Sequence, residues 1–235
     1  MALPKLNASP TYELNVPSTG QLVTFRPFLV KEQKNLLIAI ETQERRDMMR
    51  AVVRTIESCV EEKMKDLTIF DVDYMFTKIR AKSVGETATL IIPCEECNQG
   101  SEVPIELERI MLQGEVVDDK LIELTDDISV QMRYPTYADF MDNDKLFKDN
   151  SLTETILEMV MTCIESINTP EEKFSTKDEP REELVDFVES MSAEQFERVT
   201  EFVNGIPTIK QEADFVCDHC GHHNDRVLKG MDDFF

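Results

Sequence analysis

The feature that most constrains this chain is a pair of Cys-x-x-Cys segments that lie far apart in the sequence. Cys94 and Cys97 form the first pair, Cys217 and Cys220 form the second, and residues 98–216 lie between them. Two intervening residues let both thiolates turn toward one ion, and structural zinc commonly takes two such pairs as four tetrahedral ligands. If both pairs bind the same ion, the fold must bring the C-terminal segment to the middle of the chain.

Each cysteine pair is predicted to lie at the tip of a β-hairpin. Gly221, directly after Cys220, can adopt the left-handed conformation that such turns favour, and Asn98 after Cys97 is the next best residue for it. The matching contexts favour one shared zinc site, and four protein ligands leave no position for water, so the zinc is expected to be structural. The flanking strands are predicted over Thr87 to Pro93, Glu102 to Leu107, Thr208 to Val216 and Asp225 to Leu228.

The sequence leaves other interpretations of these cysteines open. The spacing is far longer than in a usual zinc ribbon, and metal-free thiols are the main alternative. A thioredoxin-like dithiol would lie at the start of a helix near a βαβ unit, which neither segment does. His219, His222 and His223 could replace a cysteine as a ligand, but they are more typical of surface residues on a turn.

The chain is strongly acidic. Its 235 residues include 47 Asp and Glu against 25 Lys and Arg, which gives a net charge of −22 at pH 7. Such a surface repels nucleic acid and anionic lipid, so we expect neither a nucleic acid nor a membrane partner. The acidic residues are spread along the chain, which fits either a basic protein partner or solubility alone.

A cytosolic protein is expected. No stretch approaches the roughly 18 to 20 apolar residues of a membrane span, and the first residues lack the apolar core of a signal peptide. In a reducing compartment the six cysteines are not expected to form disulfides. Cys59 and Cys163 fall on apolar helical stripes and are predicted to be buried.

The rest of the pattern predicts an α+β fold with an N-terminal β-hairpin, a helical bundle and a β-rich, zinc-ribbon-like module formed by the two Cys-x-x-Cys turns. The segment Asn168 to Pro180 is polar and is predicted to be a mobile connection. The hairpin is predicted over Thr11 to Arg26, and two amphipathic helices are predicted between Lys31 and Val60. A strand is predicted over Lys120 to Arg133. Further helices are predicted over Phe70 to Lys82, Thr136 to Phe147, Ser151 to Ile167, Pro180 to Glu189 and Ser192 to Val203.

A shared metal site would make residues 1–235 a single interlocked unit. Within it, the pattern divides the chain into an N-terminal hairpin (1–30), a helical segment (31–83), a zinc-ribbon-like β module (84–134 and 206–235) and a helical insertion (135–205).

No catalytic constellation is found in the sequence. It contains no Gly-rich phosphate loop, no G-x-S-x-G, no H-E-x-x-H and no deaminase signature. The three histidines all lie beside the second cysteine pair, and adjacent carboxylates such as Asp126 and Asp127 are more typical of solvated surfaces. The chain is therefore not expected to be an enzyme, and no catalytic residue is assigned.

Four stretches and the two Cys-x-x-Cys pairs together resemble the T4-type bacteriophage baseplate hub assembly family. The resemblance runs from the first residues of the chain to the last. The stretches are Met1-Ala-Leu-Pro-Lys-Leu-Asn7, Phe25-Arg-Pro-Phe-Leu-Val-Lys-Glu32, Ile69-Phe-Asp-Val-Asp-Tyr-Met-Phe-Thr-Lys-Ile-Arg-Ala-Lys-Ser-Val-Gly-Glu86 and Leu228-Lys-Gly-Met-Asp-Asp-Phe-Phe235.

The resemblance implies a non-enzymatic phage tail protein that acts in the host cytoplasm while the baseplate hub is built, with other phage baseplate hub or tail proteins as partners. It does not decide whether the protein stays in the finished virion. A different class, a zinc-ribbon regulatory adaptor that binds a host or phage protein, is the alternative. Residues 70–85 are a candidate contact surface, because Arg80 and Lys82 are basic in an acidic chain. Alternatively, the apolar residues of this segment are ordinary core and the basic ones form local ion pairs. Phe234-Phe235 either folds back onto the chain or meets a partner.

Overall fold

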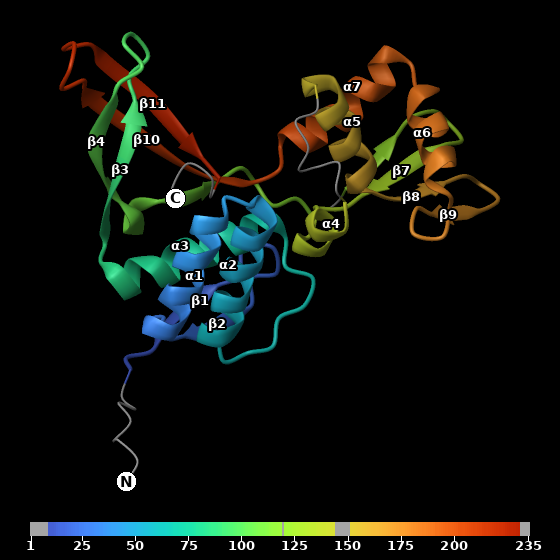
Figure 1. Ribbon diagram of the computed structural model, residues 1–235. Helices are drawn as coiled ribbons and strands as arrows, with labels where there is room; N and C mark the ends of the chain where they lie inside the picture. Colours follow the sequence, from blue (N-terminus) through green and yellow to red (C-terminus); the bar gives the residue numbers. More distant parts are fainter. Residues whose placement is uncertain (1–8, 119, 144–150, 231–235) are drawn as a thin grey trace. The chain divides into compact units, whose positions relative to one another are not determined.

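The computed structural model describes residues 9–118, 120–143 and 151–230, whose helices and strands are labelled in Figure 1. The described chain mixes helices with several small antiparallel sheets, so the predicted α+β class is confirmed. It forms two compact units. The first combines Met1–Gln113 with Thr208–Phe235, and the second is Gly114–Pro207.

The first unit begins with the predicted hairpin. Strands β1 (Tyr12–Asn15) and β2 (Leu22–Phe25) pair antiparallel, and Val23 and Phe25 point into the core, as the alternation of the sequence requires. The turn is tied to a helix far along the chain. The backbone N–H and the hydroxyl of Ser18 donate to the Asp71 carboxylate at 2.8 and 2.6 Å.

Three helices follow: α1 (Val30–Thr42), α2 (Arg45–Cys59) and α3 (Ile69–Val84). Helix α3 starts with a capping box in which Thr68 and Asp71 exchange hydrogen bonds, which satisfies backbone groups that the first turn leaves free. Its large side chains Phe70, Met75, Phe76 and Ile79 are core and not a contact surface, because each is at most 2% exposed. Val84, at the end of the helix, is 53% exposed. Lys82 forms ion pairs with Glu86 and Glu108.

Two β-ribbons complete the first unit. Strands β3 (Thr87–Pro93) and β4 (Gly100–Glu106) form one ribbon, and β10 (Thr208–Val216) and β11 (His223–Lys229) form the other. After the 3-10 helix η1 (Leu107–Arg109), strand β5 (Met111–Gln113) pairs with β10, so the order of that sheet is β11-β10-β5. The ribbons share one core with α3, made of Ala81, Ile92, Val103, Ile105, Leu107, Ile110, Ile209, Ala213 and Leu228.

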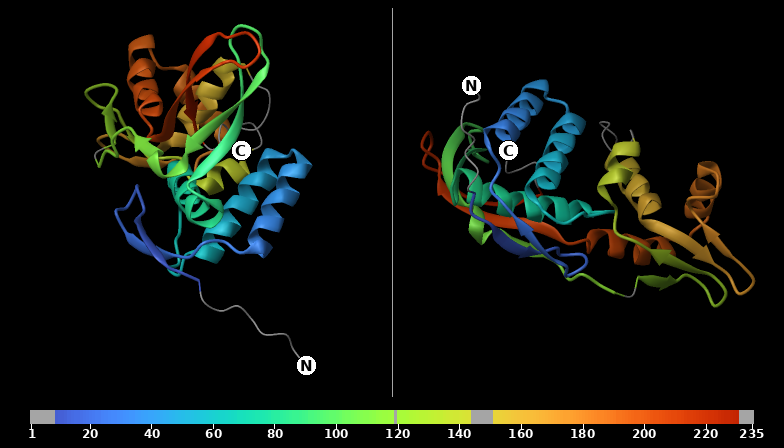
Figure 2. Two further views of the ribbon diagram at one scale, coloured as in Figure 1. Left: turned by 90° about the vertical axis from the view of Figure 1, so that its left-hand side faces the viewer. Right: turned by 90° about the horizontal axis from the view of Figure 1, so that it is seen from below.

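The second unit packs helices against a four-stranded antiparallel sheet, and Figure 2 shows it from two further sides. The sheet order is β6 (Leu121–Glu123), β7 (Ser129–Met132), β8 (Ile164–Asn168) and β9 (Lys173–Ser175). The helices are α4 (Tyr137–Asp142), α5 (Leu152–Cys163), α6 (Arg181–Glu189) and α7 (Ala193–Asn204). Among the described residues, no helix is both long and apolar enough to cross a membrane.

Several predicted elements of the second unit need correction. The predicted strand over Lys120 to Arg133 is two strands, β6 and β7, joined by a turn. The predicted helix from Ser151 ends at Cys163, because Ile164 starts strand β8 and pairs with β7. The predicted mobile connection contains strand β9, which is too short to show a periodic pattern. The predicted helix over Thr136 to Phe147 ends at Asp142, and its last part lies outside the described residues.

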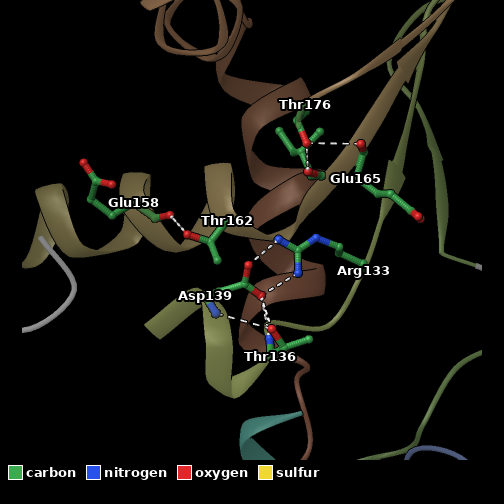
Figure 3. A network of polar contacts seen from close by, with 8 residues as sticks. Arg133, Thr136, Asp139, Glu158, Thr162, Glu165 and Thr176 are labelled. Carbon is green, nitrogen blue, oxygen red and sulfur yellow. Dashed lines mark hydrogen bonds and ion pairs between the residues drawn. The ribbon is translucent and has the colours of Figure 1, made fainter. Parts of the chain in front are cut away.

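A polar network holds the junction where α5 turns into β8 (Figure 3). The guanidinium of Arg133 donates two hydrogen bonds to the Asp139 carboxylate, at 2.6 and 2.8 Å, and the Arg133 N–H donates to the Cys163 carbonyl at 2.7 Å. Burial opposes ionisation of Asp139, but Arg133 and the two donors of Thr136 outweigh it and lower the Asp139 pKa. The Arg133–Asp139 pair was not predicted from the sequence, although Thr136-x-x-Asp139 is itself a capping-box pattern.

Candidate metal centre

The four cysteines of the two Cys-x-x-Cys segments meet in the first unit. They lie in the turns at the tips of its two β-ribbons, β3-β4 and β10-β11, which Figure 1 draws. The sulfur of Cys94 lies 3.7 Å from that of Cys220, and the sulfur of Cys97 lies 3.6 Å from that of Cys217. All four sulfur atoms lie within 4.8 Å of one another. The fold therefore brings together residues that about 120 positions separate in the sequence.

These distances fit a four-sulfur metal site. With a Zn–S bond of about 2.3 Å, the sulfurs of a regular tetrahedron are about 3.8 Å apart. Two of the S···S distances, Cys97 to Cys217 at 3.6 Å and Cys94 to Cys220 at 3.7 Å, are close to that value. They are far longer than the roughly 2.05 Å of a disulfide, and all six cysteines are free.

The two turns that carry the sulfurs have the same backbone geometry. In each turn the N–H of the first cysteine donates to the carbonyl five residues later, which is Gln99 in the first and His222 in the second, at 2.9 and 2.8 Å. In each, the residue after the second cysteine is left-handed, with φ of 55° at Asn98 and 74° at Gly221. The prediction that these two residues take this conformation is confirmed.

The three histidines lie outside the four-sulfur group. All three are exposed, and none of their ring nitrogens belongs to the cluster of ligand atoms found among the described residues. His219 Nε2 lies 3.3 Å from the Gly100 carbonyl oxygen, and His223 Nε2 lies 2.8 Å from Asp214 Oδ1. Their predicted place on the surface of the turn is confirmed.

Two buried polar residues that were not predicted from the sequence support the cluster. Asn224 is fully buried: its amide oxygen accepts from the Glu95 N–H at 2.9 Å, and its amide NH₂ donates to the Cys94 sulfur at 3.5 Å. This side chain links the second ribbon to the first turn. Ser101, 2% exposed, accepts a hydrogen bond from the Asp218 N–H at 3.3 Å and so links the first ribbon to the second turn.

The neighbours of the cluster cysteines shift their thiol pKa values in opposite directions. Burial opposes ionisation of Cys217, but the N–H groups of Cys220 and His219 lower its pKa to about 6. At Cys220 the His222 N–H favours the thiolate, but burial and the neighbouring sulfurs raise the pKa to about 12. Ionisation of one of these sulfurs opposes ionisation of its neighbours, so the cluster titrates as one group. A cation at the centre would favour the thiolate form of all four cysteines.

Cys59 and Cys163 lie outside the four-sulfur cluster. They are 2% and 0% exposed, which confirms the predicted burial. Burial raises the pKa of Cys59 to about 11 and that of Cys163 to about 12, so both stay neutral thiols in the core.

The fold and the cluster together define a class: an acidic α+β protein of two compact units, in which four thiols are grouped as in structural metal sites and not as in disulfides. More specifically, the chain belongs to the T4 bacteriophage base plate protein family, whose model matches residues 9–235. This confirms the resemblance seen in the sequence.

One relative matches almost the whole chain. The chain is 24% identical over 224 residues to the baseplate hub assembly protein gp26 of Enterobacteria phage T4, across 95% of this chain and 97% of the relative. No solved structure matches the fold.

Proposed function

We propose that this protein acts in the assembly of the phage baseplate hub, through protein–protein contacts and without catalysing a reaction. The observation that carries the proposal is the relationship to a baseplate hub assembly protein over nearly the full length of both chains. Its partners are other phage baseplate hub or tail proteins, which it meets in the host cytoplasm. The strongly acidic charge fits contacts with protein better than contacts with nucleic acid.

The proposal includes a structural zinc bound by Cys94, Cys97, Cys217 and Cys220. The S···S distances, the two equivalent turns and the N–H donors around the sulfurs support it. The ion would join the tips of the two ribbons into a zinc-ribbon-like module. Because the ligands lie on both sides of residues 98–216, the metal would also make the chain an interlocked unit that unfolds together.

A phage that lacks this gene tests the assembly role. We expect the knockout to accumulate incomplete hub intermediates, measured by sedimentation of infected-cell lysates and by electron microscopy, and a plasmid copy to restore complete baseplates. Normal baseplates in the knockout would contradict the proposal. In the same cells, a tagged copy should copurify with tail intermediates, whereas stable association with RNA polymerase would favour the regulatory adaptor.

Metal analysis tests the zinc. The purified protein is expected to hold one zinc per chain, and cobalt exchanged into the site should give the visible absorption of tetrahedral cobalt with thiolate ligands. Cys94→Ser should abolish both signals, whereas Cys59→Ser, which changes a cysteine away from the cluster, should leave both unchanged. Protein without bound metal, or a cobalt spectrum unaffected by Cys94→Ser, would contradict the assignment.

A further inference from the structure

The second unit contains a largely apolar hollow of about 320 Å³. Side chains of helix α6, strands β8 and β9 and the loops beside them line it, and five of these are apolar but only half buried. The structure thus leaves apolar surface open to water, which costs free energy unless another group covers it. The apolar wall consists of Ile128, Ile167, Phe174, Leu184 and Phe187.

Two carboxylates line the same hollow. Glu183 is exposed on the first turn of α6, and Glu179 is half buried just before that helix. Neither side chain has a cationic partner among the described residues. A ligand that fills the hollow would therefore place its own charged groups next to two unpaired negative charges.

The charge of the chain is concentrated in this unit. Residues 114–207 contain 24 Asp and Glu and 8 Lys and Arg, a net charge of −16, so that the remainder of the chain carries −6 of the total −22. Such a field repels phosphate backbones and anionic lipids and attracts cationic segments. Together with the apolar wall, it selects a ligand that is both basic and apolar.

We propose that this hollow binds a basic segment of a partner protein, with an apolar side chain inserted between α6 and the sheet and a flanking lysine or arginine paired with Glu179 and Glu183. The inference rests on the proposed function, since it names the chemistry of a protein partner. The volume lies at the small end of the range for binding hollows and suits one or two anchoring side chains. Anchors that fill such hollows dominate interface energies, and the acidic rim would speed association.

Peptide binding to the full-length protein tests the proposal. The probe is a fluorescein-labelled peptide, Lys-Lys-Phe-Leu-Lys-Lys, measured by fluorescence anisotropy in 150 mM salt. One control peptide has glutamate for every lysine, and another has alanine for the phenylalanine and leucine. The probe is expected to bind about tenfold more tightly than either control, because both the charge and the anchor contribute.

Matched variants distinguish binding at the hollow from general attraction to the negative charge of the unit. Glu183→Lys reverses one charge at the rim, while Glu201→Lys makes the same change at an exposed position of α7 that does not line the hollow. We expect Glu183→Lys to weaken probe binding about tenfold and Glu201→Lys to weaken it less than about twofold. Phe174→Asp, outside the buried core cluster of the unit, should also abolish the advantage of the apolar anchor.

Equal effects of the two charge reversals, or no measurable binding of the probe at millimolar concentration, would overturn the proposal. Complementation of the knockout phage distinguishes failure of this inference from failure of the proposed function. If wild-type and Glu183→Lys copies restore baseplates equally well, the hollow proposal fails while the assembly role stands. If the knockout has no defect, the assembly role itself fails.

Discussion

Breaking the proposed zinc link should destabilise the whole first unit, not merely release its C-terminal ribbon. Cys217→Ser removes one thiolate, and serine does not replace it as a zinc ligand under ordinary conditions. Strands β10 and β11 contribute Ile209, Ala213 and Leu228 to the core that they share with α3 and β4. Loss of the link therefore weakens packing that most of the unit depends on.

The size of the effect follows both from the free energy of metal binding and from chain entropy. A ligand present at a thousand times its dissociation constant stabilises the folded state by about 4 kcal/mol. A cross-link between Cys97 and Cys217 closes a loop of 120 residues, which corresponds to about 5 kcal/mol of chain entropy. Domains of this size are stable by about 5 to 15 kcal/mol, so the loss is a large share of the total. At about 2 to 4 °C per kcal/mol, a loss of about 4 to 5 kcal/mol should lower the melting temperature by about 8 to 20 °C.

The assay is thermal unfolding followed by circular dichroism, with and without a strong zinc chelator. Chelation should lower the melting temperature of the wild-type protein by the same amount as Cys217→Ser does, and should not lower that of the variant further. The control is Cys163→Ala, a cysteine buried in the second unit, which should keep full sensitivity to the chelator. Equal melting temperatures for wild type, chelated wild type and Cys217→Ser would refute the reasoning.

Three further predictions concern side chains that the sequence analysis did not single out. Asp71→Ala should destabilise the first unit by about 2 to 4 kcal/mol in urea unfolding, because the fully buried carboxylate accepts hydrogen bonds from Ser18 and Thr68; an unchanged midpoint would contradict this. Asn224→Ala should cost about 1 to 3 kcal/mol and weaken zinc retention in a chelator competition, since it leaves the Glu95 N–H unpaired, and equal retention would argue against its role at the cluster. The pKa of Asp139 is lower in the folded protein than its ordinary value near 3.8, so the ionised carboxylate should stabilise the second unit at pH values above 3.8. This stabilisation should be lost as the pH falls from that value through the lowered pKa. Asp139→Asn should therefore lower stability at pH 7 and flatten its decline at acid pH, as measured by urea midpoints from pH 7 to pH 3, and a parallel decline would refute the assignment.

The elements that sequence periodicity could locate are those with strong local patterns. The hairpin at Tyr12–Asn15 and Leu22–Phe25, the helices α1 to α3 and the strands around both cysteine pairs were predicted close to their observed bounds. Local signals also fixed the left-handed residues Asn98 and Gly221, because glycine and asparagine tolerate that conformation better than other residues.

The wrongly predicted elements are those whose secondary structure depends on pairing with another strand. Ile164 continues the apolar stripe of α5 in sequence, but it becomes strand because β7 offers it backbone hydrogen bonds. Strand β9 is three residues long and exists through its pairing with β8. In these segments tertiary contacts, and not local propensity, determine the secondary structure.

The sequence by itself determined the residue chemistry: four thiols in two matching turns, an acidic surface and the family to which the chain belongs. Only the tertiary structure decided that the four sulfurs meet, since residues 98–216 give no local signal of the distance between the two turns. It also decided that Asn224 supports the cluster and that half-buried apolar side chains line a hollow beside Glu183. The physical reason is that turns and helices are set by neighbours along the chain, whereas sites are set by packing between segments that the sequence keeps apart.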